Sequence, residues 1–268
     1  MLTAHLRRAA LRAPRALPRA FSTISDPHVA GSPFEPLDLS QPNPPLADFI
    51  TQDWATFGDR VAITDGITGD TRTFEELHRD VASVAGGMRD MGITRGSVVG
   101  VQSPNHVDYG TVVLAAARFG AAITPVNPLY TKYELAHQLR GSGATVMITH
   151  PMCYDVVTSD EANDGADVRE VLVLGGDAPA GATALDTLKG RAAGDGVDAT
   201  VTGVAGDDLV VLPFSSGTTG LPKGTMVTHD NLVTNLRQFV APEFRFVGAG
   251  DAIISPLPMF HIYGPLME

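Results

Sequence analysis

The most informative part of this 268-residue sequence is Val210-Val-Leu-Pro-Phe-Ser-Ser-Gly-Thr-Thr-Gly-Leu-Pro-Lys-Gly-Thr-Met-Val-Thr-His229. Its first residues, Val210 to Phe214, form an apolar run of the length of a buried strand. Hydroxyls and glycines then surround a single lysine, Lys223. Glycines let successive backbone N–H groups turn toward one point, and hydroxyls and a lysine add donors suited to phosphate oxygens. These residues predict a strand followed by a loop that binds a polyphosphate.

Two other interpretations of this loop are weaker. A Walker A loop requires Gly-x-x-x-x-Gly-Lys-Ser/Thr, whereas here Gly217 is followed by Gly220, and Gly224 comes directly after Lys223. A flexible surface linker would have a similar Ser/Thr/Gly composition. Such a linker rarely follows a buried strand directly, and we therefore favour the phosphate loop.

The run Ser215-Ser-Gly-Thr-Thr-Gly-Leu-Pro-Lys-Gly224 resembles the phosphate-binding signature of the adenylate-forming (AMP-dependent synthetase/ligase) superfamily. This superfamily includes acyl-CoA synthetases, 4-coumarate–CoA ligases, firefly luciferase and the adenylation domains of peptide synthetases. A second run, Pro256-Leu-Pro-Met-Phe-His-Ile-Tyr-Gly264, resembles the next motif of the family in the form found in the CoA-ligase branch. Further similarities occur in family order at 59–62, 103–105, 125–128 and 134–138, so that the resemblance covers residues 46–268.

The resemblance implies a reaction and a set of site residues. A fatty or aryl carboxylic acid would attack the α-phosphorus of ATP to give acyl-AMP, and the complete enzyme would then form a thioester with CoA. Lys223 and His261 would be the catalytic residues, with His261 orienting the carboxylate, although a core histidine is the alternative at that position. The phosphates of ATP would be bound by Ser215, Ser216, Gly217, Thr218, Thr219, Gly220 and Lys223, with Mg²⁺ shared between the nucleotide and Thr218.

The rest of the chain predicts an α/β fold with mostly parallel sheets covered by helices. The predicted strands are apolar without alternation, which is typical of parallel strands buried on both faces. By resemblance this is the amino-terminal part of the large domain of an adenylate-forming enzyme, without the carboxy-terminal lid domain. We predict helices at 46–57, 74–91, 108–119 and 131–139 (the last closed by Gly141), a hairpin at 61–74, and strands at 98–101, 121–126, 144–149, 171–174 and 210–214.

Composition excludes several classes of partner. The net charge of −11 disfavours nonspecific binding to nucleic acid, and one cysteine leaves no internal disulfide framework. No apolar run is long enough to predict an integral membrane segment. The partner that the family resemblance implies is a small-molecule carboxylic acid. His78, His106, His137 and His150 lie outside any ligand motif, and we expect them to be surface or core residues.

The amino terminus differs from the rest of the chain. Residues 1–25 contain five arginines and no acidic residue, a composition typical of an organelle transit peptide. A biased nucleotide composition or a misassigned start codon is the alternative. We predict a mitochondrial-matrix location, with plastid, peroxisome or cytoplasm as alternatives, and a Pro-rich linker at 26–45.

Residues 46–268 would then be a partial AMP-binding domain. The family's adenine-contacting Thr-Glu segment, ribose-binding aspartate and lid lysine have no counterpart in this sequence. We therefore expect a truncated fragment with little activity of its own. The alternative is a non-catalytic fragment that acts at most as a phosphate-binding or interaction module, and a peptide-synthetase or luciferase-like relative also stays open.

Overall fold

The computed structural model describes residues 37–38, 40–175, 178–189, 203–215, 221–241, 248 and 250–262. The chain divides into two units, Met1–Leu39 and Ser40–Glu268, and every helix and strand below belongs to the second. The predicted transit peptide lies outside the described residues. None of the described helices is both long and apolar enough to cross a bilayer.

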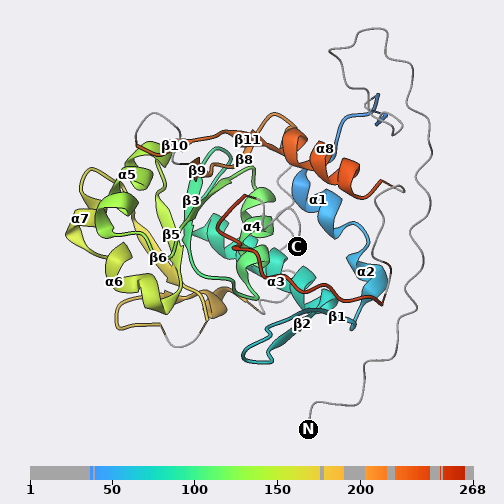
Figure 1. The fold of residues 1–268 in the computed structure, drawn as a ribbon, viewed down its shortest axis with the longest axis horizontal. Coiled ribbons are helices and arrows are strands. Elements are labelled where there is room, and N and C mark those ends of the chain that lie inside the picture. Colours follow the sequence, from blue (N-terminus) through green and yellow to red (C-terminus); the bar gives the residue numbers. More distant parts are fainter. Residues whose placement is uncertain are drawn as a thin grey trace, which may run out of the picture. The chain divides into compact units, whose positions relative to one another are not determined.

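A seven-stranded sheet forms the centre of the second unit (Figure 1). Its strand order is β11-β8-β4-β3-β5-β6-β7. All neighbouring strands are parallel except β11 and β8, which confirms the predicted, mostly parallel sheet. The strands are β3 (Val98–Gln102), β4 (Ala122–Val126), β5 (Val146–Thr149), β6 (Glu170–Val173), β7 (Thr183–Ala184), β8 (Leu209–Val211) and β11 (Val227–Thr228).

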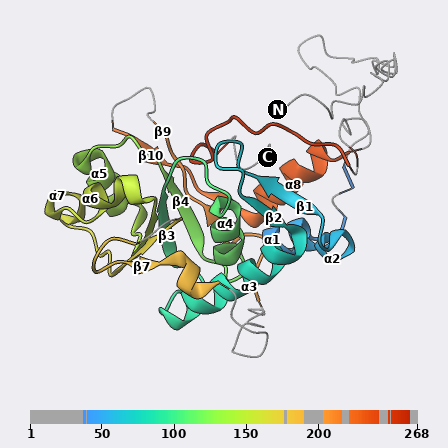
Figure 2. The same cartoon turned by 90° about the horizontal axis from the view of Figure 1, so that it is seen from below.

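Helices cover both faces of this sheet (Figure 2). Because successive side chains of a strand point to opposite faces, Val99 of β3 packs with α3 and α4, whereas Val98 packs with the cluster formed by α5, α6 and α7. This burial on both faces explains why the strands are apolar without alternation. The covering helices are α3 (Phe74–Asp90), α4 (Tyr109–Ala117), α5 (Lys132–Ser142), α6 (Tyr154–Val157) and α7 (Asp160–Asn163), with short 3₁₀ turns η1 (Pro151–Cys153) and η2 (Leu185–Leu188).

Capping residues fix the ends of the long helices. The predicted capping box of α3 is present, with Thr73 and Glu76 bonded to each other's backbone N–H groups. Thr131 and Glu134 form the same arrangement at the start of α5. The predicted end of α5 at Gly141 is wrong: the helix continues to Ser142, and Gly143 closes it in the left-handed conformation at φ 67°.

The amino-terminal elements of this unit pack beside the sheet. The predicted hairpin is confirmed, with β1 (Val61–Thr64) antiparallel to β2 (Thr71–Thr73). The predicted single helix is instead two short helices, α1 (Leu46–Thr51) and α2 (Trp54–Phe57). A helix missed from the sequence, α8 (His229–Phe239), packs against α1. The N–H of Leu46 donates to Nδ1 of buried His229 at 3.0 Å and joins α1 to α8.

Candidate functional site

The two described ends of the predicted phosphate loop pair with each other as antiparallel strands. β9 (Phe214–Ser215) pairs with β10 (Lys223–Gly224), in a register that places Lys223 opposite Ser215. The N–H of Thr225 donates to the carbonyl of Pro213 at 2.9 Å and extends the pairing. The predicted continuous strand 210–214 is therefore wrong: the chain forms β8 and then β9, separated at Pro213, which has no N–H for a ladder.

The β9–β10 hairpin follows directly after the carboxyl end of a parallel strand, β8. β8 lies parallel to β4, with Val211 opposite Ile123, and β11 returns antiparallel to β8 on its outer side. In open α/β sheets, ligands bind outside the carboxyl ends of the parallel strands. The hairpin thus lies at the edge of the sheet where a nucleotide site is expected.

Two of the predicted phosphate-binding residues are described, and the structure brings them together. Ser215 and Lys223 are exposed register partners. Ser216, Gly217, Thr218, Thr219 and Gly220 lie outside the described residues, and so does the predicted Mg²⁺ contact of Thr218. Within the described part of the chain, no group of three His, Cys, Asp or Glu side chains is placed to hold a metal ion.

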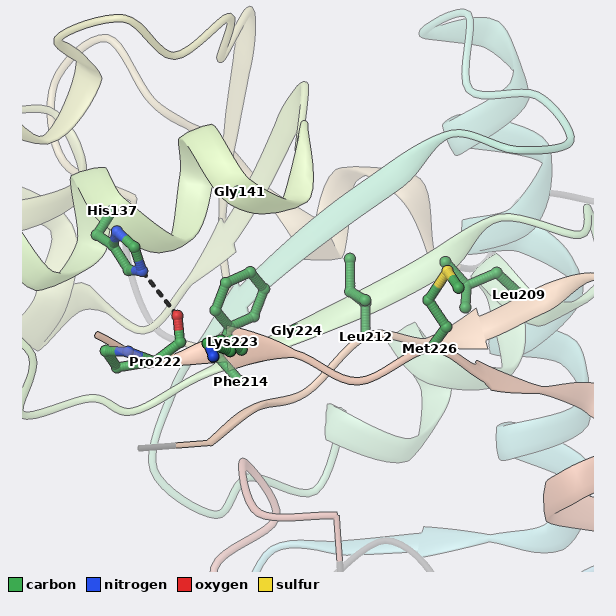
Figure 3. A pocket seen from close by; sticks show the side chains of 9 residues that line it. All are labelled: His137, Gly141, Leu209, Leu212, Phe214, Pro222, Lys223, Gly224 and Met226. Carbon is green, nitrogen blue, oxygen red and sulfur yellow. Dashed lines mark hydrogen bonds between the residues drawn. The ribbon is translucent and has the colours of Figure 1, made fainter. Parts of the chain in front are cut away.

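A cavity of about 420 Å³ lies against the hairpin, and Lys223 is among its lining residues (Figure 3). The ring of Phe214 packs between α5 and β10. A Cβ added at Gly141 or at Gly224 would lie 3.0 Å from carbons of that ring. Glycine at both positions therefore allows the close packing of Phe214, since a side chain at either one would require the ring to move by a few tenths of an ångström. The other lining residues are His137, Leu209, Leu212, Pro222 and Met226.

Helix α5 holds this hairpin through polar contacts that the sequence did not reveal. Nε2 of His137 lies 2.8 Å from the carbonyl oxygen of Pro222. Next to it, the buried amide of Gln138 donates to Oγ1 of Thr124 at 2.8 Å. Thr124 in turn donates to the carbonyl of Leu212 at 2.9 Å, just before β9. α5, β4 and the hairpin are therefore linked by a continuous set of hydrogen bonds.

His261 lies in a second segment, which Asn105 binds from the loop after β3. The Asn105 amide donates to the carbonyl of Leu257 at 2.7 Å and accepts from the N–H of Met259 at 2.9 Å. Met259 and Ile262 pack against the core on either side of the exposed His261. The cavity beside Lys223 does not include His261 among its lining residues, and the roles of both residues stay predictions.

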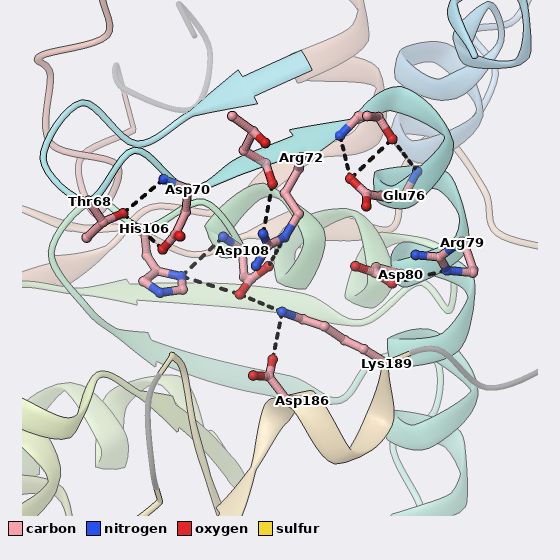
Figure 4. Close-up of polar contacts among 12 residues, drawn as sticks. Thr68, Asp70, Arg72, Glu76, Arg79, Asp80, His106, Asp108, Asp186 and Lys189 are labelled. Carbon is pink, nitrogen blue, oxygen red and sulfur yellow. Dashed lines mark hydrogen bonds and ion pairs between the residues drawn. The ribbon is translucent and has the colours of Figure 1, made fainter. Parts of the chain in front are cut away.

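A buried ion-pair cluster follows the same end of β3 (Figure 4). Asp108 has a side chain only 2% exposed, and its Oδ2 lies 2.6 Å from Nζ of Lys189. Nε of Arg72 lies 3.7 Å from the other oxygen, and the ring of His106 lies beside the carboxylate. Burial lowers the pKa of His106, and it raises the pKa of the neighbouring Asp80 carboxyl. Since these charges largely compensate one another, we interpret the cluster as structural.

Comparison with known proteins defines the class. The profile of the AMP-binding enzyme family matches residues 50–268. The chain belongs to this family. Its curated relatives include 4-coumarate–CoA ligase 5 of Oryza sativa subsp. japonica, 37% identical over 82% of this chain, and 4-coumarate–CoA ligase 4 of Arabidopsis thaliana, 35% identical over 84% of this chain. These alignments cover only 39% and 41% of those two proteins, so that the chain spans less than half of their length.

Solved structures agree with this fold. A long-chain-fatty-acid–CoA ligase from Archaeoglobus fulgidus superposes with a TM-score of 0.72 at 29% identity, covering 84% of this chain and 44% of that one. ATP-bound MatB from Rhodopseudomonas palustris superposes with a TM-score of 0.66 at 28% identity, covering 81% of this chain and 41% of that one. The predicted fold class, the mostly parallel α/β fold of adenylate-forming enzymes, is therefore confirmed.

Proposed function

We propose that this chain forms the phosphate-binding part of an acyl- or aryl-CoA ligase. The whole protein would activate a fatty or aryl acid with ATP and transfer the acyl group from acyl-AMP to CoA. The observation that supports this most is the β9–β10 register, which places Ser215 beside Lys223 at the carboxyl edge of the sheet. The two ends of the predicted loop are thereby held together, as a site that surrounds a diphosphate requires.

The chemistry explains why such a loop is needed. A carboxylate oxygen attacks the α-phosphorus, the bond from that phosphorus to the β-phosphate bridging oxygen breaks, and pyrophosphate leaves with the electron pair. Two anions must meet, and negative charge grows on the leaving group. Lys223 supplies a mobile positive charge at the mouth of the loop. One well-aimed donor to a developing charge is typically worth about 2.7–4 kcal/mol, and positioning supplies roughly 7–11 kcal/mol more.

Magnesium fits this proposal as an ion carried by the substrate. Mg²⁺ prefers oxygen ligands and is often bound by substrate phosphates with few protein ligands. When bound, Mg²⁺ would neutralise phosphate charge, with the Thr218 hydroxyl as the proposed protein ligand.

ATP–pyrophosphate exchange with the full-length protein tests the function, using a panel of fatty and aryl acids. We expect exchange with at least one acid, and Lys223→Ala should reduce it by about 100-fold or more, the loss typical for a donor to developing charge. Lys132→Ala is the matched control, because Lys132 pairs with Glu161 on the surface of α5 and should leave exchange unchanged.

The possible outcomes separate the candidates. Exchange in Lys223→Ala at the wild-type rate under limiting ATP would contradict the role of this lysine. ATP binding in equilibrium dialysis, without exchange for any acid, would instead favour the alternative of a non-catalytic phosphate-binding module.

A further inference from the structure

We propose that His137 is a positioning residue for the phosphate loop, and this inference rests on the proposed function. His137 belongs to α5, far from the loop in sequence, and no motif of the loop includes it. Its ring nitrogen Nε2 lies 2.8 Å from the carbonyl oxygen of Pro222, the residue directly before Lys223 (Figure 3).

The chemistry of this contact sets the state of the histidine. A backbone carbonyl can only accept, so Nε2 must carry the proton and His137 must be the donor. The carbonyl of Pro222 and the N–H of Lys223 belong to the same planar peptide group. A bond to that carbonyl therefore restrains the orientation of the peptide from which the Lys223 side chain begins.

The donor is itself held in place. The ring of His137 meets the ring of Phe214 edge to face, with centroids 6.3 Å apart and an interplanar angle of 90°. Phe214 is in turn packed against Gly141, one turn further along α5, and against Gly224 of β10. The neighbouring Gln138 is buried and bonded to β4. His137 thus projects from a helix face that cannot easily rotate or withdraw.

The pairing of β9 with β10 and the bond from His137 restrain the backbone at Lys223, which the flexible lysine side chain cannot do by itself. A lysine side chain loses much rotamer freedom when it binds a phosphate, and any backbone motion at its base would add to that cost. With β9 paired on one side and His137 bonded on the other, the base of Lys223 is restrained before a ligand binds. Preorganisation of this kind improves binding mostly by lowering its entropic cost.

Three substitutions separate the hydrogen bond from the packing. His137→Phe keeps an aromatic ring against Phe214 but has no donor. His137→Gln retains an N–H donor with a similar reach, and His137→Ala removes both features. His78→Phe is the matched control, because His78 is an exposed histidine on α3, outside the hairpin.

The first measurement does not depend on activity. Trypsin cleaves after Lys223, which is exposed, and the rate of cleavage of the Lys223–Gly224 bond reports how often this segment opens. We expect cleavage in His137→Phe and His137→Ala to be about threefold to tenfold faster than in the wild type, as for the loss of one hydrogen bond. His137→Gln and His78→Phe should remain near the wild-type rate. Thermal melts show whether each variant is folded at the temperature of digestion.

The second measurement is the KM for ATP in pyrophosphate exchange, which should rise by a similar factor in His137→Phe and recover in His137→Gln. Unchanged cleavage in His137→Phe overturns the positioning role. Faster cleavage with an unchanged KM for ATP would support the role of His137 in restraining Lys223 but would contradict the proposed nucleotide site. The failure of this inference and the failure of the proposed function are therefore distinguishable.

Discussion

Removing the lysine of the buried Asp108 cluster tests how much its ion pairs stabilise the fold. Lys189→Met keeps the aliphatic stem but leaves the Asp108 carboxylate, whose side chain is 2% exposed, without its 2.6 Å partner. Breaking a buried ion pair costs about 3–5 kcal/mol. Arg72 remains 3.7 Å away and compensates part of the charge, whereas burial lowers the pKa of His106 and disfavours its cationic form.

We therefore expect the free energy of unfolding to fall by about 2–3 kcal/mol, less than the full cost of an uncompensated charge. For a domain of this size, that loss corresponds to a decrease in Tm of about 4–12 °C. Urea unfolding followed by circular dichroism at pH 7 measures the change. Asp108→Asn completes a double-mutant cycle, and it removes no helix cap, since the Asp108 side chain makes no capping hydrogen bond at the start of α4.

The cycle decides whether the reasoning holds. The double variant should be more stable than the sum of the two single changes predicts, with a coupling of about 1 kcal/mol or more. Arg169→Met is the surface control: its pair with Asp167 is over two-thirds exposed on both sides and should contribute almost nothing. Additive single changes, or a loss in Lys189→Met no larger than in this control, would refute the reasoning.

Two further predictions concern the buried His229 and the side-chain hydrogen bonds of Asn105. Burial lowers the pKa of His229, so the folded state binds this proton less readily than the unfolded chain, and stability present above about pH 6.5 is lost as the pH falls below it. Between pH 7.5 and 5.5, His229→Gln, which can still accept from Leu46, should lose less stability than the wild type in urea titrations; equal losses would contradict this account. Asn105→Ala removes both side-chain bonds to the segment before His261 and should lower exchange at saturating ATP while leaving ATP binding intact. Asn105→Asp keeps only an acceptor and should be intermediate, and wild-type exchange in the alanine variant would contradict the role of Asn105.

Local patterns predicted most of the fold because local chemistry determines it. The capping box at Thr73 and Glu76 is a local signal, because its hydrogen bonds join residues three positions apart. The strands could also be predicted, because burial on both faces favours apolar residues at successive positions. The end of α5 was mispredicted because two nearby glycines could each have ended the helix. Gly143 takes the left-handed conformation, whereas Gly141 makes room for the ring of Phe214. Only the tertiary contact distinguishes them.

The candidate site also contains some features that local sequence predicts and others that depend on contacts between distant residues. The loop composition around Lys223 predicts phosphate binding by itself, because glycines and hydroxyls act within a few residues. His137 and Asn105 could not be found in this way, since each bonds a carbonyl far along the chain. The break at Pro213 did have a local signal, because proline cannot donate to a ladder. Helix α8 had one as well, in the reciprocal cap of Thr228 and Asn231.

The pairing of Ser215 with Lys223 also determines which sequence changes the hairpin would tolerate. Extra residues inserted between these two positions would lengthen the loop, while Ser215 and Lys223 could stay paired. One residue added or deleted at Leu212 or Pro213 would instead shift the ladder by a single step, and a single step turns every side chain of a strand to the opposite face. Ser215 would then turn to the opposite face from its present one, although the composition of the loop would be unchanged.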